Sequence, residues 1–173
     1  VGKNTAVSPG AVVFENDLIQ LIQYAPATEK VYAKPLLIIP PWINKFYILD
    51  LNPRKSMVKW LVEQGHTVFV VSWVNPDQRH GQKSWEDYMF EGGLTAIEKA
   101  LEETGQKSLN LASYCVGGTM GGTLMAWLGK TGGVRRRRRL LDRLWLRARV
   151  GRGRRGATRR RLGDPVRSRS GRH

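Results

Sequence analysis

The stretch that decides the fold is Leu109-Asn110-Leu111-Ala112-Ser113-Tyr114-Cys115-Val116-Gly117-Gly118-Thr119. An apolar segment leads to the only cysteine of the chain, and two glycines then open a run of small residues. This order predicts a strand, a sharp turn and a helix. That arrangement is called a nucleophile elbow, and here a thiol takes the place of the serine hydroxyl in the G-x-S-x-G motif.

Cys115 is therefore the candidate nucleophile, and its neighbours have roles in the same turn. The turn points the N-terminus of the next helix at the side chain, which favours a thiolate and a developing oxyanion. We expect Gly117 where two backbone segments come too close for a Cβ atom, with Gly118 as the second glycine of the elbow. Ser113 replaces the usual first glycine, so the strand must make room for a hydroxymethyl group. The competing interpretation of Cys115 is a small buried hydrophobic residue.

The net charge of +15 comes entirely from the end of the sequence. Residues 1–132 carry twelve basic and twelve acidic side chains, whereas residues 133–173 carry seventeen arginines, two aspartates and no lysine. Such an abrupt use of arginine alone is typical of GC-rich coding sequence read in a shifted frame. The alternative is a basic tail that binds nucleic acid, but Trp145 is its only aromatic residue, so base stacking has little support.

Several classes of protein are disfavoured by what the sequence lacks. A single cysteine excludes an internal disulfide, and no cluster of histidine, cysteine and aspartate has the spacing of a metal site. No apolar run approaches the roughly 20 residues that span a bilayer, and no signal peptide is visible. We expect a cytoplasmic protein whose first residue, Val1, is a cut end.

Apolar patterning predicts an α/β fold in which strands alternate with helices. We expect strands and helices over the following ranges: strands at 11–14, 18–24, 35–40, 67–72 and 108–113, and helices at 56–64, 84–105 and 117–129. The first two strands join at Asn16-Asp17, and Ser84 caps the second helix together with Asp87. The inward-facing positions of the first two helices are expected to be Met57, Val58, Trp60 and Leu61, then Leu94, Ile97, Ala100 and Leu101.

The strand and helix alternation implies a parallel sheet covered on both faces. In such sheets the active site lies at the carboxyl ends of the strands. The loop over residues 41–47 and the Cys115 turn both leave from that edge. We expect Trp42 and Phe46 in this loop to serve packing.

Three blocks of sequence, over residues 40–51, 64–76 and 114–119, closely resemble the polyhydroxyalkanoate synthases. The likeness is greatest to the class that polymerises short units such as 3-hydroxybutyryl-CoA. It covers about residues 1–132 and stops before the arginine-rich segment. The resemblance implies an α/β-hydrolase fold, present in part through the elbow, with residues 1–132 as a partial catalytic domain and residues 133–173 as a disordered tail outside the fold.

The family's catalytic set is a cysteine, a later aspartate and a still later histidine, and only the cysteine maps here, onto Cys115. Asp142, Asp164 and His173 follow it, but no predicted strand surrounds them, so we expect the triad acid and base to be absent. His66 and His80 come in the wrong chain order, and we interpret each as a solvated turn histidine.

The implied reaction is acyl transfer from a 3-hydroxyacyl-CoA substrate to the Cys115 thiolate and then to a growing polyester. The oxyanion would be held by the backbone N–H of Val116 and by one from Ile43 or Asn44. No cofactor is expected, since the substrate carries coenzyme A. The resemblance also implies a homodimer at the surface of cytoplasmic polymer granules, and nucleic acid is not an expected partner.

A sheet that stops at the nucleophile strand has an unpaired edge and an uncovered apolar face. We therefore expect the chain alone to fold poorly or aggregate, with negligible polymerase turnover because the base is missing. Two other functions stay open: a cysteine-nucleophile hydrolase of the same fold, and nucleic-acid binding through the tail.

Overall fold

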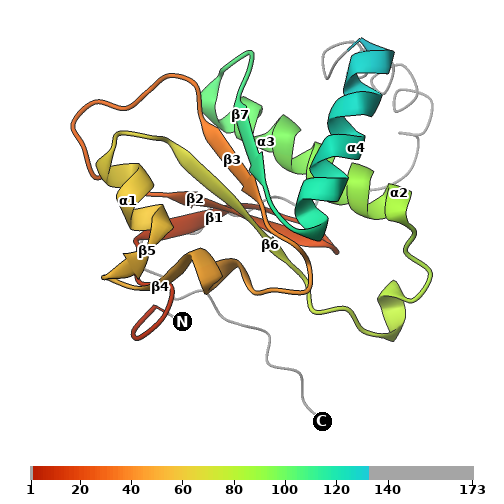
Figure 1. Cartoon of the computed structure of the whole chain (residues 1–173), viewed down its shortest axis with the longest axis horizontal. Coiled ribbons are helices and arrows are strands. Elements are labelled where there is room, and N and C mark those ends of the chain that lie inside the picture. Colours follow the sequence, from red (N-terminus) through yellow and green to blue (C-terminus); the bar gives the residue numbers. More distant parts are fainter. Residues whose placement is uncertain (1, 133–173) are drawn as a thin grey trace, which may run out of the picture.

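A computed structural model of the chain describes residues 2–132 (Figure 1). Its main feature is a five-stranded sheet with the strand order β1-β2-β6-β3-β7, beside a small two-stranded sheet, β4-β5. The strands are β1 (Gly10–Glu15), β2 (Ile19–Tyr24), β3 (Leu36–Ile39), β4 (Asp50–Asn52), β5 (Lys55–Ser56), β6 (Val68–Trp73) and β7 (Asn110–Ser113). The predicted arginine-rich tail lies outside the described residues.

The main sheet is mixed rather than wholly parallel. Strands β6, β3 and β7 run parallel, as the alternation of strands and helices predicts. On the other side of β6, β2 pairs with it in the antiparallel direction, and β1 pairs with β2 as an antiparallel hairpin at the outer edge. The Asn16 side chain stabilises the hairpin turn, because its Oδ1 atom accepts hydrogen bonds from the backbone of Leu18 and Ile19, each at 2.9 Å.

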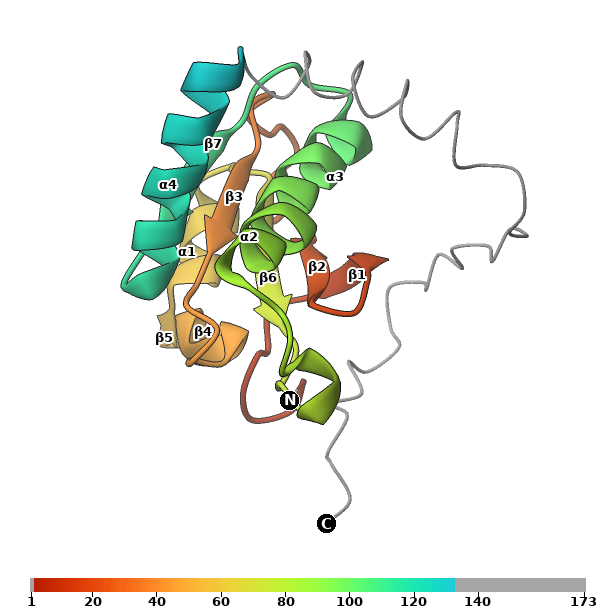
Figure 2. The same cartoon turned by 90° about the vertical axis from the view of Figure 1, so that its right-hand side faces the viewer.

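Helices cover both faces of the sheet, with α1 on one side and α2, α3 and α4 on the other (Figure 1). They are α1 (Met57–Glu63), α2 (Trp85–Asp87), a π-helix η3 (Tyr88–Leu94), α3 (Thr95–Thr104) and α4 (Val116–Thr131), with 3-10 turns η1 (Phe46–Leu49) and η2 (Gln78–His80). Figure 2 shows α3 and α4 beside each other over their face. Alternate residues of β3 enter opposite cores, since Leu37 and Ile39 pack with α3 and α4, and Ile38 packs with α1.

The predicted inward face of α1 is wrong in part. Ser56 is the N-cap of the helix, and its Oγ accepts the backbone N–H of Lys59 at 2.9 Å. The buried residues, however, are Val58, Leu61 and Val62, whereas Met57 is exposed and Trp60 is 57% exposed. An i, i+3, i+4 stripe fits one helix face, and this stripe places Trp60 on the opposite side.

The segment predicted as one helix from Ser84 to Gly105 has the expected ends and an unexpected middle. Ser84 and Asp87 form the capping box, and Gly105 ends α3 with φ at 65°. Between them, η3 has π geometry. Its Gly92 packs so closely against the Trp73 ring that a Cβ atom there would overlap the ring. Leu94, Ile97 and Ala100 are buried as predicted, but Leu101 is only half-buried.

Strand β7 forms one edge of the described sheet, and a hollow of about 1070 Å³ runs along it. Residues of α3, β7 and α4 line this hollow, and Cys115 is not among them. The exposed edge agrees with the expected unpaired strand, and self-association of the chain stays a prediction. Within residues 2–132, no helix combines the length and the apolarity needed to cross a bilayer.

Candidate active site

Cys115 occupies a strained turn between the end of β7 and the start of α4. Its φ of 54° and ψ of −138° lie in a region that residues other than glycine rarely adopt. Such a conformation costs on the order of 1–3 kcal/mol, and it persists where the surrounding structure imposes it. The side chain is exposed, so the alternative interpretation of a buried hydrophobic residue is wrong.

The backbone of α4 passes directly against the end of β3 at Gly117. A Cβ atom there would lie 2.6 Å from the carbonyl oxygen of Ile39 and 2.8 Å from the carbonyl carbon of Pro40. These are backbone atoms, which cannot move aside as the end of a flexible side chain can, so only glycine fits this position. Gly118 differs, because a Cβ atom there would approach no atom closer than 3.7 Å. Close backbone packing therefore requires a glycine at position 117 and does not require one at position 118.

The side chain of Ser113 is accommodated by Gly121 of α4. A Cβ atom on Gly121 would lie 2.5 Å from Ser113 Oγ and 3.2 Å from its Cβ. The missing glycine before the nucleophile is thus offset by a glycine in the helix. Sequence reasoning missed Gly121, although its spacing of four from Gly117 puts both on one helix face.

The two turns expected to form the oxyanion hole leave the sheet side by side. Strands β3 and β7 are parallel neighbours, with Ile39 opposite Ser113, so the loop after β3 and the Cys115 turn start at the same level. Val116 is the first residue of α4, and the N–H of a first helical residue has no acceptor within its helix. Ile43 is 73% exposed and Asn44 is exposed. Their roles stay predictions.

Aromatic residues fill the space between the β3 loop and the region after β6. The Trp42 ring lies 5.9 Å from Trp73, 5.7 Å from Trp85 and 5.1 Å from Tyr88, measured between centroids. Trp42 therefore packs, as predicted, and Phe46 packs in the α1-side core. The Trp73 Nε1–H also donates a buried hydrogen bond to the carbonyl oxygen of Pro40 at 2.7 Å. No sequence signal indicated this bond.

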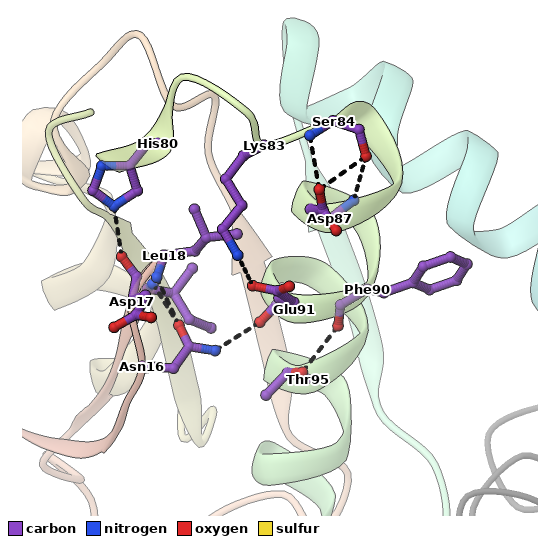
Figure 3. A network of polar contacts seen from close by, with 11 residues as sticks. Asn16, Asp17, Leu18, His80, Lys83, Ser84, Asp87, Phe90, Glu91 and Thr95 are labelled. Carbon is purple, nitrogen blue, oxygen red and sulfur yellow. Dashed lines mark hydrogen bonds and ion pairs between the residues drawn. The ribbon is translucent and has the colours of Figure 1, made fainter. Parts of the chain in front are cut away.

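A polar network holds the segment after β6 against the hairpin turn (Figure 3). His80 Nε2 lies 3.1 Å from the Asp17 carbonyl oxygen, and Lys83 Nζ donates to Glu91 Oε2 at 2.5 Å. The hydrogen bond to Glu91 raises the pKa of Lys83. Asn16 Nδ2 donates to the Glu91 carbonyl oxygen at 2.9 Å, so the hairpin turn is also fixed to η3.

The two upstream histidines are both engaged in structure. The expectation that His80 is solvated is wrong: it is 9% exposed, and its Nδ1 lies 3.0 Å from Asp77 Oδ1. Hydrogen bonds from Arg79 hold the pKa of Asp77 well below its usual range. The His66 ring packs at a tilt of 39° against Tyr32, with 5.0 Å between ring centroids, and it is half-buried, so it is not fully solvated either. It precedes β6, at the amino edge of the sheet, whereas Cys115 lies at the carboxyl edge.

Tyr114, immediately before the candidate nucleophile, turns away from solvent. Its hydroxyl oxygen is buried and has no hydrogen-bond partner within the described structure. Burial raises the pKa of this phenol, and the nearby Cys115 charge raises it further. Tyr114 packs against the α1-side core and so fixes one side of the strained turn. Residues 2–132 contain no group of three or more His, Cys, Asp or Glu residues that could hold a metal ion.

Comparison with known proteins gives consistent matches. Residues 1–61 match the family described as Poly-beta-hydroxybutyrate polymerase (PhaC) N-terminus. The chain is 58% identical over 134 residues to a poly(3-hydroxyalkanoate) polymerase of Methylorubrum extorquens. The aligned residues make up 78% of this chain and 22% of that protein. It is 53% identical over 132 residues to the poly(3-hydroxyalkanoate) polymerase subunit of Cupriavidus necator, covering 76% of this chain and 22% of that one. The chain therefore spans about one fifth of the length of these relatives.

Proposed function

Because the chain belongs to the poly(3-hydroxyalkanoate) polymerase family, we propose that it carries the acyl-accepting part of such a polymerase. The substrate class is (R)-3-hydroxyacyl-CoA and the product is a polyester, with release of coenzyme A. The observation that supports this most is the exposed Cys115 on its strained turn, in a chain that is 53–58% identical to polymerases.

The proposed reaction has two steps. First the Cys115 thiolate attacks the thioester carbonyl, a new C–S bond forms, and the bond to the coenzyme A sulfur breaks. Coenzyme A leaves as a thiolate and takes a proton from solvent. Exchange of one thioester for another is nearly balanced in energy, and a thiolate both attacks and leaves well, so sulfur suits this step.

In the second step the hydroxyl oxygen of the growing chain attacks the enzyme thioester. An oxoester forms, the bond to Cys115 Sγ breaks, and the thiolate is restored. A general base must take the hydroxyl proton, because an alcohol is far less acidic than a thiol. Since His66 and His80 are engaged in structure, the proposal places this base outside residues 2–132.

Both steps place negative charge on the acyl oxygen, and we assign its stabilisation to two turns. One donor is the Val116 N–H at the start of α4, and the other is an N–H of Ile43 or Asn44 in the loop after β3. The parallel pairing of β3 with β7 supports this assignment, because it brings both turns to one edge. Removing one such donor typically costs about 100-fold to 1000-fold in rate.

The mixed α/β sheet is consistent with the wider proposal of an α/β-hydrolase fold, in which residues 1–132 form the part that ends with the elbow. The proposal includes no cofactor, because coenzyme A arrives with the substrate. It also includes a homodimer, a polyester partner and a cytoplasmic place at polymer granules, all of which rest on the family resemblance alone.

A chimera tests the proposal in a protein of full length. In the Methylorubrum extorquens polymerase, the matched residues of this chain replace their 58%-identical counterparts. We expect this chimera to release coenzyme A from 3-hydroxybutyryl-CoA and to form polymer, and we expect Cys115→Ala to abolish both. A Cys115→Ala chimera that retains turnover would contradict the proposal. Release of free 3-hydroxybutyrate without polymer would instead favour a hydrolase.

A further inference from the structure

The carbonyl group of Pro40 is held from two sides. On one side the Trp73 Nε1–H donates a hydrogen bond to its oxygen at 2.7 Å, in a buried setting. On the other side the backbone of Gly117 packs so closely that a Cβ atom would lie 2.9 Å from the same oxygen. This one peptide group therefore connects the end of β6, the end of β3 and the start of α4.

The first two residues after β3 cannot hold the turn through backbone donors. Pairing between β3 and β7 ends at Ile39 and Ser113. The next two residues, Pro40 and Pro41, have no backbone N–H, so neither can donate a hydrogen bond that would hold the turn. The Pro40 carbonyl accepts its hydrogen bond from a side chain of another strand, Trp73 of β6.

The Trp73 ring itself is held firmly. Gly92 lies against its outer edge, where any Cβ atom would overlap the ring, and the π-helix η3 carries that glycine. Tyr88 and Trp42 flank the ring at 5.7 and 5.9 Å. The π geometry is secured by side chains from outside (Figure 3), because Asn16 donates to the Glu91 carbonyl and Thr95 to the Phe90 carbonyl. Such π-bulges are frequent at functional sites.

We propose that Trp73 is a positioning residue for acylation, acting through the Pro40 carbonyl to set the spacing between the β3 turn and the N-terminus of α4. The inference rests on the proposed function. Those two turns carry the backbone donors assigned to the oxyanion, Val116 on one side and Ile43 or Asn44 on the other. Without the Trp73 bond we expect the β3 donor to shift relative to Val116, whereas the Cys115 thiol stays exposed on its turn.

Two reactions of the Cys115 thiol test this inference, because only one of them forms an oxyanion, and acylation is measured at saturating 3-hydroxybutyryl-CoA so that weaker substrate binding does not affect the rate. Acylation by 3-hydroxybutyryl-CoA develops an oxyanion, whereas alkylation by iodoacetamide displaces iodide and develops none at the carbonyl oxygen. In the chimera, Trp73→Phe removes the N–H donor. We expect the rate of Cys115 acylation to fall about tenfold to 100-fold, as for a small misplacement of a catalytic group, and alkylation to change less than twofold.

Trp85→Phe is the matched control, since it removes another indole of the same aromatic cluster, one that is 38% exposed. We expect its acylation rate to stay within twofold of the parent. If Trp73→Phe does not fold, β-(3-benzothienyl)alanine at position 73 keeps the bicyclic shape and lacks the N–H, with the same expected result.

The outcomes are distinguishable. Unchanged acylation in the Trp73 variants would overturn the inference, and so would equal losses of acylation and alkylation, which would indicate a general disturbance. Failure of the proposed function shows itself separately, as acylation that persists in the Cys115→Ala chimera.

Discussion

Two turns leave the same edge of the sheet, and they are stabilised in opposite ways. The turn at Cys115 is marked by a short motif, because Ser113, Gly117 and Gly121 are small enough for α4 to pack closely against β7 and the end of β3. The turn at Pro40 is set by a tryptophan 33 residues away, which is itself held by a glycine in a π-helix. A candidate nucleophile can thus be predicted from a short motif, whereas its surroundings depend on contacts between distant segments.

Gly117→Ala is expected to break the local turn most severely. Its Cβ atom would meet backbone at 2.6 Å, so α4 must move away from β3. We expect a loss of about 1–3 kcal/mol in the free energy of unfolding, measured on the chimera by denaturant titration, and a larger loss of acylation than for Trp73→Phe. Gly118→Ala is the control, since its Cβ has space and alanine favours a helix by up to about 1 kcal/mol. Equal effects of the two substitutions would contradict the local account of the turn.

Exchanging the side-chain sizes at positions 113 and 121 tests the contact between β7 and α4 that supports the Cys115 turn. Gly121→Ala alone should cost about 1–3 kcal/mol, since its Cβ would lie 2.5 Å from Ser113 Oγ. Ser113→Gly together with Gly121→Ala should recover most of that cost, giving a coupling energy in a double-mutant cycle. If the two effects simply add, the proposed exchange of space is wrong.

The smallest expected effect concerns the strain at Cys115 itself. At φ 54° a glycine is favoured, so Cys115→Gly should be more stable than Cys115→Ala by about 1 kcal/mol. The same pair at Thr119, an exposed position within α4, should show the reverse order by about 1 kcal/mol. Chimera variants compared by thermal denaturation provide the measurement. If the Cys115→Ala variant is as stable as the Cys115→Gly variant, or more stable, the backbone at position 115 carries no strain and this account of the turn is contradicted.

Local patterns in the sequence predicted the hairpin, the buried strands, the Ser84 cap and the strand, turn and helix around Cys115. These features follow from alternation, capping chemistry and glycine placement within a few residues. The prediction that Trp60 faces inward is wrong. An aromatic residue beside an apolar stripe suggests burial, and only the packing of α1 on the sheet shows which residues of the helix are buried. The sequence near His80 predicts a solvated side chain, since nothing there indicates the Asp17 carbonyl that lies 63 residues away.

The π-helix and the Trp73 bond could not be predicted for the same reason. Both depend on the fit of one indole ring between Gly92 and Pro40, and neither contact leaves a periodic signal in the chain. The turn at Cys115 and the close approach at Gly117 were therefore predictable, whereas Gly121 was missed and the nucleophile role of Cys115 stays a prediction. The support for the opposite turn required the folded structure.

Peptide mapping by mass spectrometry of the chimera, quenched within the first turnover of 3-hydroxybutyryl-CoA, tests the role of Cys115 most directly. The mechanism predicts one 3-hydroxybutyryl group on the peptide that contains Cys115, formed at the rate of the first release of coenzyme A. Turnover with that peptide unmodified, or with the acyl group on another residue, would contradict it.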